Sequence, residues 1–242
     1  MLFGKHLIGE VRWRWLVGEV FVVIIGVLIA LSIEQIWSDR LDRELELDYL
    51  NTIRSAVQAD IDFVSGYLQE RLKIKMDALE AIGPVVRGSL PVPDNMELFL
   101  NNVGMGAVGA VAPTYVVNRE IFDDLVSTGN LPLIRDPRIR NEIAAYYSWY
   151  DSLYHRNLAR LTEYPAFVLG ILPSELRDEL NLAAMESFNI DRAIEAIMSD
   201  EFETLLNREQ NLAFFMARSN TQFLRRANIF LQELDEHIER LD

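Results

Sequence analysis

Histidine and carboxylate side chains are the residues of this chain best suited to bind a metal or to move protons. His237 follows Glu233 by four residues, which places both on one face of a helix, as two metal ligands would be. A tetrahedral site needs two more ligands, which the sequence does not locate, so we interpret the pair as part of a solvated helix face. Neighbouring acids such as Asp60 and Asp62 point in different directions on a helix and do not indicate an acid–base pair.

A glycine-rich run from Gly104 to Gly109 matches the dinucleotide-binding pattern G-x-G-x-x-G. That chemistry needs a strand before the glycines and a helix that starts among them, so that free backbone amides meet the pyrophosphate. Residues 96–103 instead predict a short helix, and Pro113 follows the run. We therefore expect a flexible apolar loop at the glycines and no nucleotide. The sequence motifs of phosphate-binding loops, serine hydrolases and zinc proteases do not occur.

Arg135, Arg138 and Arg140 form a dense basic cluster. Between them, Asp136-Pro137 predicts the cap and first residue of a helix, whose N-terminus could attract an anion. Asp136 already supplies negative charge at that position, so we interpret the cluster as a solvated loop with local ion pairs. Because no stronger chemical signature occurs, we expect a protein that is not an enzyme and that binds no cofactor or metal.

The composition narrows the class of protein further. The chain has 242 residues and no cysteine, which excludes disulfide bonds, thiolate metal ligands and a cysteine nucleophile. Apolar residues make up 50% of the chain, enough to fill a hydrophobic core. The 37 acidic residues outnumber the 23 basic ones, and the net charge of −14 repels nucleic-acid phosphates. We expect no nucleic-acid partner.

The first element that organises the chain is an apolar segment near the N-terminus. Residues 16–33 carry a single charge, that of Glu19, and Trp13, Trp15 and Trp37 stand at the two ends of the segment. Tryptophan is typical of the interface between membrane and water. A helix from Trp15 to Trp37 measures about 33 Å at about 1.5 Å per residue, close to the ~30 Å thickness of the hydrocarbon layer. The sequence therefore predicts a transmembrane helix.

This helix divides the chain into a basic N-terminal segment (1–14), a transmembrane anchor (15–37) and an acidic all-α extramembrane domain (38–242). A cleaved signal peptide and a buried core helix are the alternatives for the anchor. Orientation follows from the flanking basic residues, which number three before the anchor (Lys5, Arg12 and Arg14) and two after it (Arg40 and Arg43). This count favours a cytoplasmic N-terminus.

Two glutamates of the anchor share a helix face with small residues. At 100° per residue, Glu19, Gly26, Ala30 and Glu34 fall within about 80° of the circumference, and Gly18 lies about 80° further round. Carboxylates in a bilayer usually face protein or water, and small residues let a second helix approach closely. The face is either a pairing surface, for a second copy or a larger membrane protein, or two glutamates that reach headgroup water independently.

Two long amphipathic helices are predicted in the extramembrane domain, one at 38–82 and one at 200–241. Both keep apolar residues at three- and four-residue spacing, and the first ends at Gly83-Pro84. The middle region, 83–199, holds loops and short helices. We predict an all-α fold in which the transmembrane helix is followed by an elongated helical bundle with two long antiparallel helices. The alternative is that the long helices pair between chains, as a coiled coil.

Within the middle region, residues 83–95 predict a loop and residues 114–128 a helix that stops at Gly129. A further helix is predicted at 138–163. It carries an aromatic-rich stripe that comprises Ile139, Ile143, Tyr146, Tyr147, Tyr150, Leu153 and Tyr154. Such a stripe is more typical of a packed core than of a cofactor site.

Two local signatures occur in order along the chain. The first is Gly18-Glu19, Gly26-Val27-Leu28-Ile29-Ala30-Leu31, Glu34-Gln35 and Trp37; the second is Ser127-Thr128-Gly129-Asn130-Leu131-Pro132-Leu133-Ile134, Arg138-Ile139-Arg140 and Tyr146-Tyr147. Together they resemble a family of bacterial single-pass membrane-anchored helical proteins catalogued only as a domain of unknown function. The resemblance implies a membrane-anchored helical protein and brings no catalytic residues. The family has a basic linker soon after the tryptophan, whereas this chain is mixed and acidic there, so the orientation follows from the count of basic residues alone. On that count we expect a bacterial inner-membrane protein with a cytoplasmic N-terminus and a periplasmic C-terminal domain.

These observations predict a non-enzymatic interaction protein that contacts the lipid bilayer and either other membrane proteins or further copies of itself. It would be an accessory or scaffolding subunit of a larger membrane assembly, or a homo-oligomer. The alternative is an extracytoplasmic ligand sensor that holds its ligand near Tyr146, Tyr147, Trp149 and Tyr150 and signals through the long helices. A hydrolase built from scattered carboxylates has less support.

Overall fold

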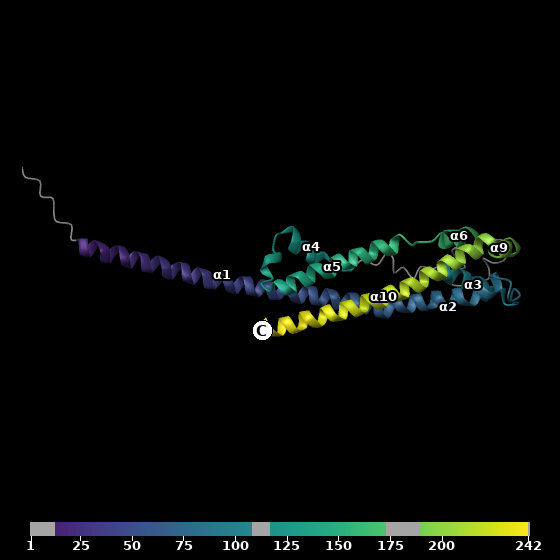
Figure 1. Cartoon of the computed structure of the whole chain (residues 1–242), viewed down its shortest axis with the longest axis horizontal. Helices are drawn as coiled ribbons and strands as arrows, with labels where there is room; N and C mark the ends of the chain where they lie inside the picture. The colour runs from purple at the N-terminus through teal and green to yellow at the C-terminus, as the bar shows by residue number, and fades with distance from the viewer. Residues whose placement is uncertain (1–12, 108–116, 173–188, 242) are drawn as a thin grey trace, which may run out of the picture. The chain divides into compact units, whose positions relative to one another are not determined.

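The computed structural model describes residues 13–107, 117–172 and 189–241 (Figure 1). Within these ranges all regular secondary structure is helical and no strand occurs, which confirms the predicted all-α class. The chain forms two units, Met1–Asp48 and Tyr49–Asp242, which are described in turn.

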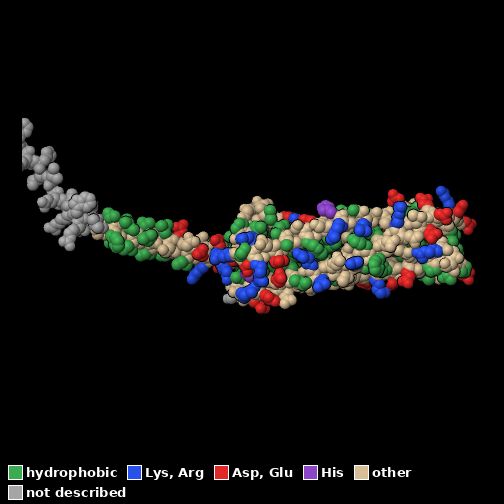
Figure 2. Space-filling model, in the orientation of Figure 1, with side chains coloured by type: hydrophobic (Ala, Val, Ile, Leu, Met, Phe, Trp, Pro, Cys, Tyr) green, Lys and Arg blue, Asp and Glu red, His purple; other side chains and the backbone are tan. Residues whose placement is uncertain are grey.

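The first unit contains most of helix α1 (Trp13–Phe63). The large hydrophobic side chains from Val20 to Trp37 are all between 42% and 70% exposed, and no other described part of the chain buries them. Figure 2 shows hydrophobic side chains (green) gathered over the N-terminal part of α1. Among the described residues, one helix is long and apolar enough to cross a membrane, and this stretch supplies its apolar window.

The second unit begins at Tyr49, inside α1. Helix α1 then leads into a π-helical turn (Val64–Leu68) and α2 (Gln69–Val86). The predicted end at Gly83-Pro84 was wrong, because the helix continues to Val86. Pro84 lies in the last turn, where its missing N–H removes a single hydrogen bond. The helix ends at Val86, and Gly88 two residues later turns the chain away, because its φ of 67° lies in the left-handed region and its N–H donates to the carbonyl of Val85.

Helix α3 (Met96–Ala107) contains the first two glycines of the predicted nucleotide-like loop. The expectation of a flexible loop was therefore wrong for Gly104 and Gly106, while residues 108 and 109 of the run lie outside the described part. Gly106 packs so closely that an added Cβ would lie 2.6 Å from Leu79 Cδ2 and 3.0 Å from the Tyr164 hydroxyl. Its small size allows α2 and α3 to approach each other, which explains the glycine without a ligand.

Helix α4 (Glu120–Ser127) covers the second half of the helix expected at 114–128, and residues 114–116 lie outside the described residues. Gly129 follows it with a φ of 74°, as the predicted left-handed stop requires. A 3-10 turn (Leu131–Leu133) leads to α5 (Pro137–Leu158), which ends before the predicted residue 163. The predicted cap is confirmed, because the Arg138 N–H donates to Asp136 Oδ1 at 2.8 Å.

Helices α6 (Tyr164–Ile171), α9 (Ile190–Ile197) and α10 (Asp200–Leu241) complete the described elements. Helix α10 contacts α2, α5, α6 and α9, and Figure 1 shows α2 and α5 beside it. The core of α2, α3, α6, α9 and α10 buries, among others, Leu79, Ile82, Leu100, Tyr164 and Phe202.

The aromatic stripe of α5 is core, as predicted. Tyr146 stacks on Phe230 of α10 with 4.7 Å between ring centroids, and Tyr147 stacks on Phe122 of α4 at 4.5 Å. Both tyrosines are 1% exposed. The stripe therefore joins α4 and α10 to α5.

Candidate functional site

The residues proposed as a pairing face lie on one continuous helix, α1, and all are exposed: Gly18, Glu19, Gly26, Ala30 and Glu34. An added Cβ at Gly18 or Gly26 would meet no heavy atom within 4 Å, so nothing in the described chain covers the small residues. The polar group of Ser32 is satisfied locally, because its hydroxyl donates to the Leu28 carbonyl at 2.7 Å. This bond suits a helix in lipid, where backbone and hydroxyl groups have no water partner.

The two candidate metal ligands on α10 do not act together. His237 is 5% exposed, and its Nδ1 lies 3.6 Å from Asp136 Oδ2, so the interpretation of a solvated face was wrong for this residue. No group of three His, Asp or Glu side chains suited to a metal occurs in the described ranges. The carboxylate of Asp136 caps α5, and the N–H of Arg138 lowers the pKa of Asp136 below its usual value, with the nearby His237 adding to the effect.

The basic cluster beside this cap makes local bonds. Arg140 Nη1 donates to the Ile134 carbonyl at 3.2 Å, and the Arg138 backbone is bonded to Asp136. These contacts agree with the prediction of a loop whose arginines bond to groups nearby in the sequence. Nothing in their geometry converges on a position for an anion.

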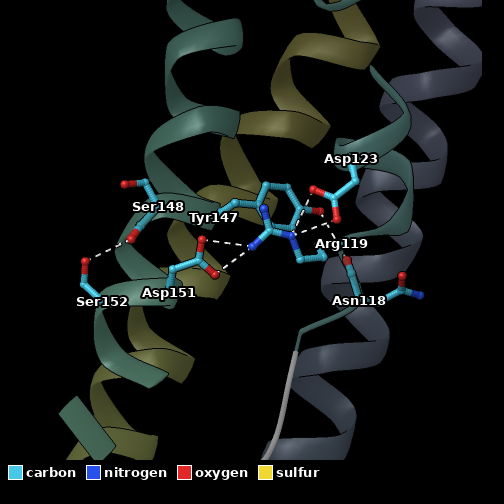
Figure 3. A network of polar contacts seen from close by, with 7 residues as sticks. All are labelled: Asn118, Arg119, Asp123, Tyr147, Ser148, Asp151 and Ser152. Atoms are coloured by element: carbon cyan, nitrogen blue, oxygen red, sulfur yellow. Dashed lines mark hydrogen bonds and ion pairs between the residues drawn. The ribbon is translucent and has the colours of Figure 1, made fainter. Parts of the chain in front are cut away.

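The strongest polar network of the second unit surrounds Arg119, at the start of α4 (Figure 3). Arg119 Nε donates to both carboxylate oxygens of Asp123 at 3.0 Å, and Nη1 donates to Asp151 of α5 at 2.7 and 2.9 Å. These bonds raise the pKa of Arg119, so the guanidinium stays charged. Two carboxylates already offset the charge of this guanidinium, which makes it a weak attractor for an anionic substrate, and its contacts join α4 to α5.

A second part of the network involves Asn118 and the buried Asp60 of α1. The Asn118 N–H donates to Asp60 Oδ1 at 3.1 Å, and the Tyr147 hydroxyl donates to the Asn118 carbonyl at 3.4 Å. Burial, reinforced by the charge of Asp60, raises the pKa values of Tyr146 and Tyr147 far above the usual value. Both phenols stay protonated at neutral pH, which makes them poor bases and suits a structural role.

Sequence reasoning missed this network. Asp60 was set aside as one of many acids, and Arg119 was not singled out. The available signals were an aspartate inside the apolar face of a helix and an arginine four residues before an aspartate. Neither signal identifies the partner on another helix, because Arg119 and Asp151 are 32 residues apart.

One charged pair lies in the hydrophobic core. Lys75 of α2 and Glu209 of α10 form an ion pair with side chains 5% and 1% exposed, and the Thr162 hydroxyl donates to the same carboxylate. Buried pairs of this kind hold two helices in register, although their net contribution to stability is small. The described residues thus contain polar clusters that fix helices and no arrangement of nucleophile, base and oxyanion donors.

Comparisons of this chain with protein-family models, with curated proteins and with solved structures found no match. The function is therefore argued from the geometry above.

Proposed function

We propose that this chain is a membrane-anchored, non-enzymatic interaction protein, either an accessory or scaffolding subunit of a larger membrane assembly or a homo-oligomer. The observation that carries the proposal is the apolar surface of α1 from Val20 to Ile33, which the described chain leaves uncovered and in which Ser32 is the most polar residue. Transfer of one large apolar side chain out of water contributes about 1.5–3 kcal/mol. A lipid bilayer supplies the missing cover along this whole length.

The proposed orientation places the N-terminus in the cytoplasm and the C-terminal domain in the periplasm of a bacterial inner membrane. The count of basic residues on the two sides of the anchor supports this orientation. The resemblance of the two signatures to a bacterial membrane family supports the choice of a bacterial membrane.

The pairing face of the anchor would seat the protein against its partner. Gly26 and Ala30 are one turn apart and offer a flat surface to a second helix, and Glu34 adds a polar group on the same side. In lipid, that carboxylate gains from a hydrogen-bonding partner on the neighbouring helix.

The second unit would supply an elongated surface for protein contact, with its two long helices antiparallel. Support comes from the order of the contacts between them: Arg54 pairs with Asp235, Lys75 with Glu209, and Arg87 Nη2 donates to Asn207 at 2.9 Å. Along these three pairs the residue number rises from Arg54 to Arg87 while the number of the partner on α10 falls, which is the order expected of antiparallel helices. Helix α10 alone has 42 residues, or about 63 Å at about 1.5 Å per residue.

A second candidate function is ligand sensing. It is favoured by a hollow of about 250 Å³ between α5 and α10, lined in part by Tyr146 of the aromatic stripe. A ligand there would contact α10, the longest helix of the second unit, directly.

Purification from native membranes in a mild detergent tests the interaction hypothesis. We expect the intact particle, measured by native mass spectrometry, to contain a defined partner or a fixed number of copies. Ala30→Leu should break up the particle by adding bulk to the pairing face. Leu28→Phe also adds bulk at a similar depth but on the opposite face, and it should leave the particle intact. A bare monomer from native membranes contradicts the proposal.

A further inference from the structure

The hollow between α5 and α10 combines opposite charges with an apolar wall. Two cations, Arg225 and Arg226, and two anions, Glu142 and Glu233, line it. Its remaining lining residues are Tyr146, Gln222, Ile229 and Phe230. The volume of about 250 Å³ is below the roughly 300–1,000 Å³ typical of sites for drug-sized molecules, which limits an occupant to about the size of one amino acid.

The four charged side chains have no polar partner within the described ranges. None of them forms a hydrogen bond or an ion pair with any residue in the described ranges, although cations and anions share one small hollow. Arg226 Nε is buried and has no hydrogen-bond partner there. A buried donor without a partner is costly, and a bound acceptor would remove that cost.

The aromatic surroundings hold one cation in place. The guanidinium of Arg226 lies over the ring of Trp149 of α5, with Cζ 5.4 Å from the ring centroid. A stacked guanidinium keeps its N–H groups in a fixed plane, and this fork matches the two oxygens of a carboxylate. Behind it, the stack of Tyr146 on Phe230 gives the hollow a rigid apolar wall.

We propose that this hollow binds a free α-amino acid with an apolar side chain. The arginines would take the carboxylate, and Glu142 and Glu233 would take the ammonium group. Ile229 and Phe230 would contact the side chain. Two positive and two negative groups sum to zero formal charge, which complements a zwitterion better than it complements a simple anion or cation.

The proposal gives the sensing candidate a class of ligand, but binding itself does not depend on the membrane anchor or on any partner protein. Failure to bind would therefore remove the ligand site and leave the interaction hypothesis untouched, whereas loss of the anchor would not affect binding.

Isothermal titration of the full chain in detergent micelles tests the proposal with L-leucine and L-phenylalanine. We expect saturable binding of at least one of them below about 10 mM, and no binding of two analogues of leucine: 4-methylpentanoate, which lacks the amine, and 3-methylbutylamine, which lacks the carboxylate. Absence of binding by both amino acids overturns the proposal. Equal binding of 4-methylpentanoate and leucine also overturns it, because the glutamates would then have no role.

Variants locate the site. Arg226→Gln and Glu233→Gln should each weaken binding by tenfold or more, because each removes one charge partner of the zwitterion. Arg218→Gln changes an exposed arginine of the same helix outside the hollow and should bind as the unmodified chain does. Circular dichroism melting of each variant reports folding separately. A folded Arg226→Gln variant with unchanged affinity contradicts the assignment.

Discussion

Arg119 Nη1 lies 2.7 Å from Asp151 Oδ1, and this ion pair connects the start of α4 to the middle of α5. The same guanidinium donates to Asp123, one turn into α4. Arg119 therefore holds the first turn of α4 and also joins α4 to α5. It is the clearest example of what the polar side chains of the second unit do: they set the positions of helices.

Replacing Arg119 by Lys should therefore destabilise the second unit. The lysine keeps the charge but cannot bind two carboxylates with one planar fork. The side chain is 31% exposed, so solvent screening limits the loss to about 1 kcal/mol. Thermal unfolding of the full chain in micelles, followed by circular dichroism, measures the effect. Arg218→Lys is the control, and equal melting temperatures of the two variants would contradict the network's role.

The pKa of Asp136 predicts a dependence of stability on acid pH. Because the folded state lowers this pKa below 3.8, the carboxylate contributes stability above about pH 4, and the contribution is lost as the pH falls through the lowered value. Asp136→Asn keeps a capping side chain without the charge. The melting temperatures of the unmodified chain and of Asp136→Asn, measured between pH 2 and pH 7, should differ at neutral pH and converge at the acid end. A difference that stays constant with pH would refute the assignment.

Gly106 should not tolerate a side chain, although it lies inside a helix. Alanine there would place Cβ 2.6 Å from Leu79 Cδ2, and we expect a loss of about 1–3 kcal/mol from overpacking. Gly66→Ala is the matched control, because an added Cβ at Gly66 meets nothing within 4 Å. It should leave stability unchanged or raise it, since alanine favours helix. The order of the two melting temperatures checks the prediction, and the reverse order would contradict the close packing of α2 and α3.

The buried pair of Lys75 and Glu209 predicts a strong non-additive effect. Lys75→Met leaves Glu209 charged and unpaired in the core, which should cost about 3–5 kcal/mol. The double variant Lys75→Met with Glu209→Leu removes both charges and should recover most of that loss. The coupling energy follows from chemical unfolding of four proteins: the unmodified chain, the single variants Lys75→Met and Glu209→Leu, and the double variant. Additive losses would show that the two groups do not depend on each other.

Much of the helix pattern could be predicted from the sequence because local rules decide it. The apolar run from Val20 to Ile33 and the cap at Asp136 need only neighbouring residues to be interpreted. The end of α2 was misplaced because Pro84 and Gly88 both punctuate helices, and which of them acts depends on the last-turn hydrogen bonds.

The sites were harder to predict because their partners are distant in sequence. Gly106 is a glycine because Leu79 and Tyr164 leave no room for a side chain there, which periodicity does not reveal. The hollow lined by Glu142 and Arg226 depends on how α5 and α10 pack, and the sequence alone shows only charged residues on two separate helices. The sequence did indicate the aromatic stripe that forms its wall.

The anchor is the central claim, and extraction of membranes with alkaline carbonate tests it most directly. We expect the full chain to stay in the membrane pellet and to enter solution only with detergent. A variant with arginine at Ile24 and Leu28 should move to the supernatant, because charges near the bilayer centre oppose insertion. Recovery of the unmodified chain in the aqueous fraction without detergent would contradict the account.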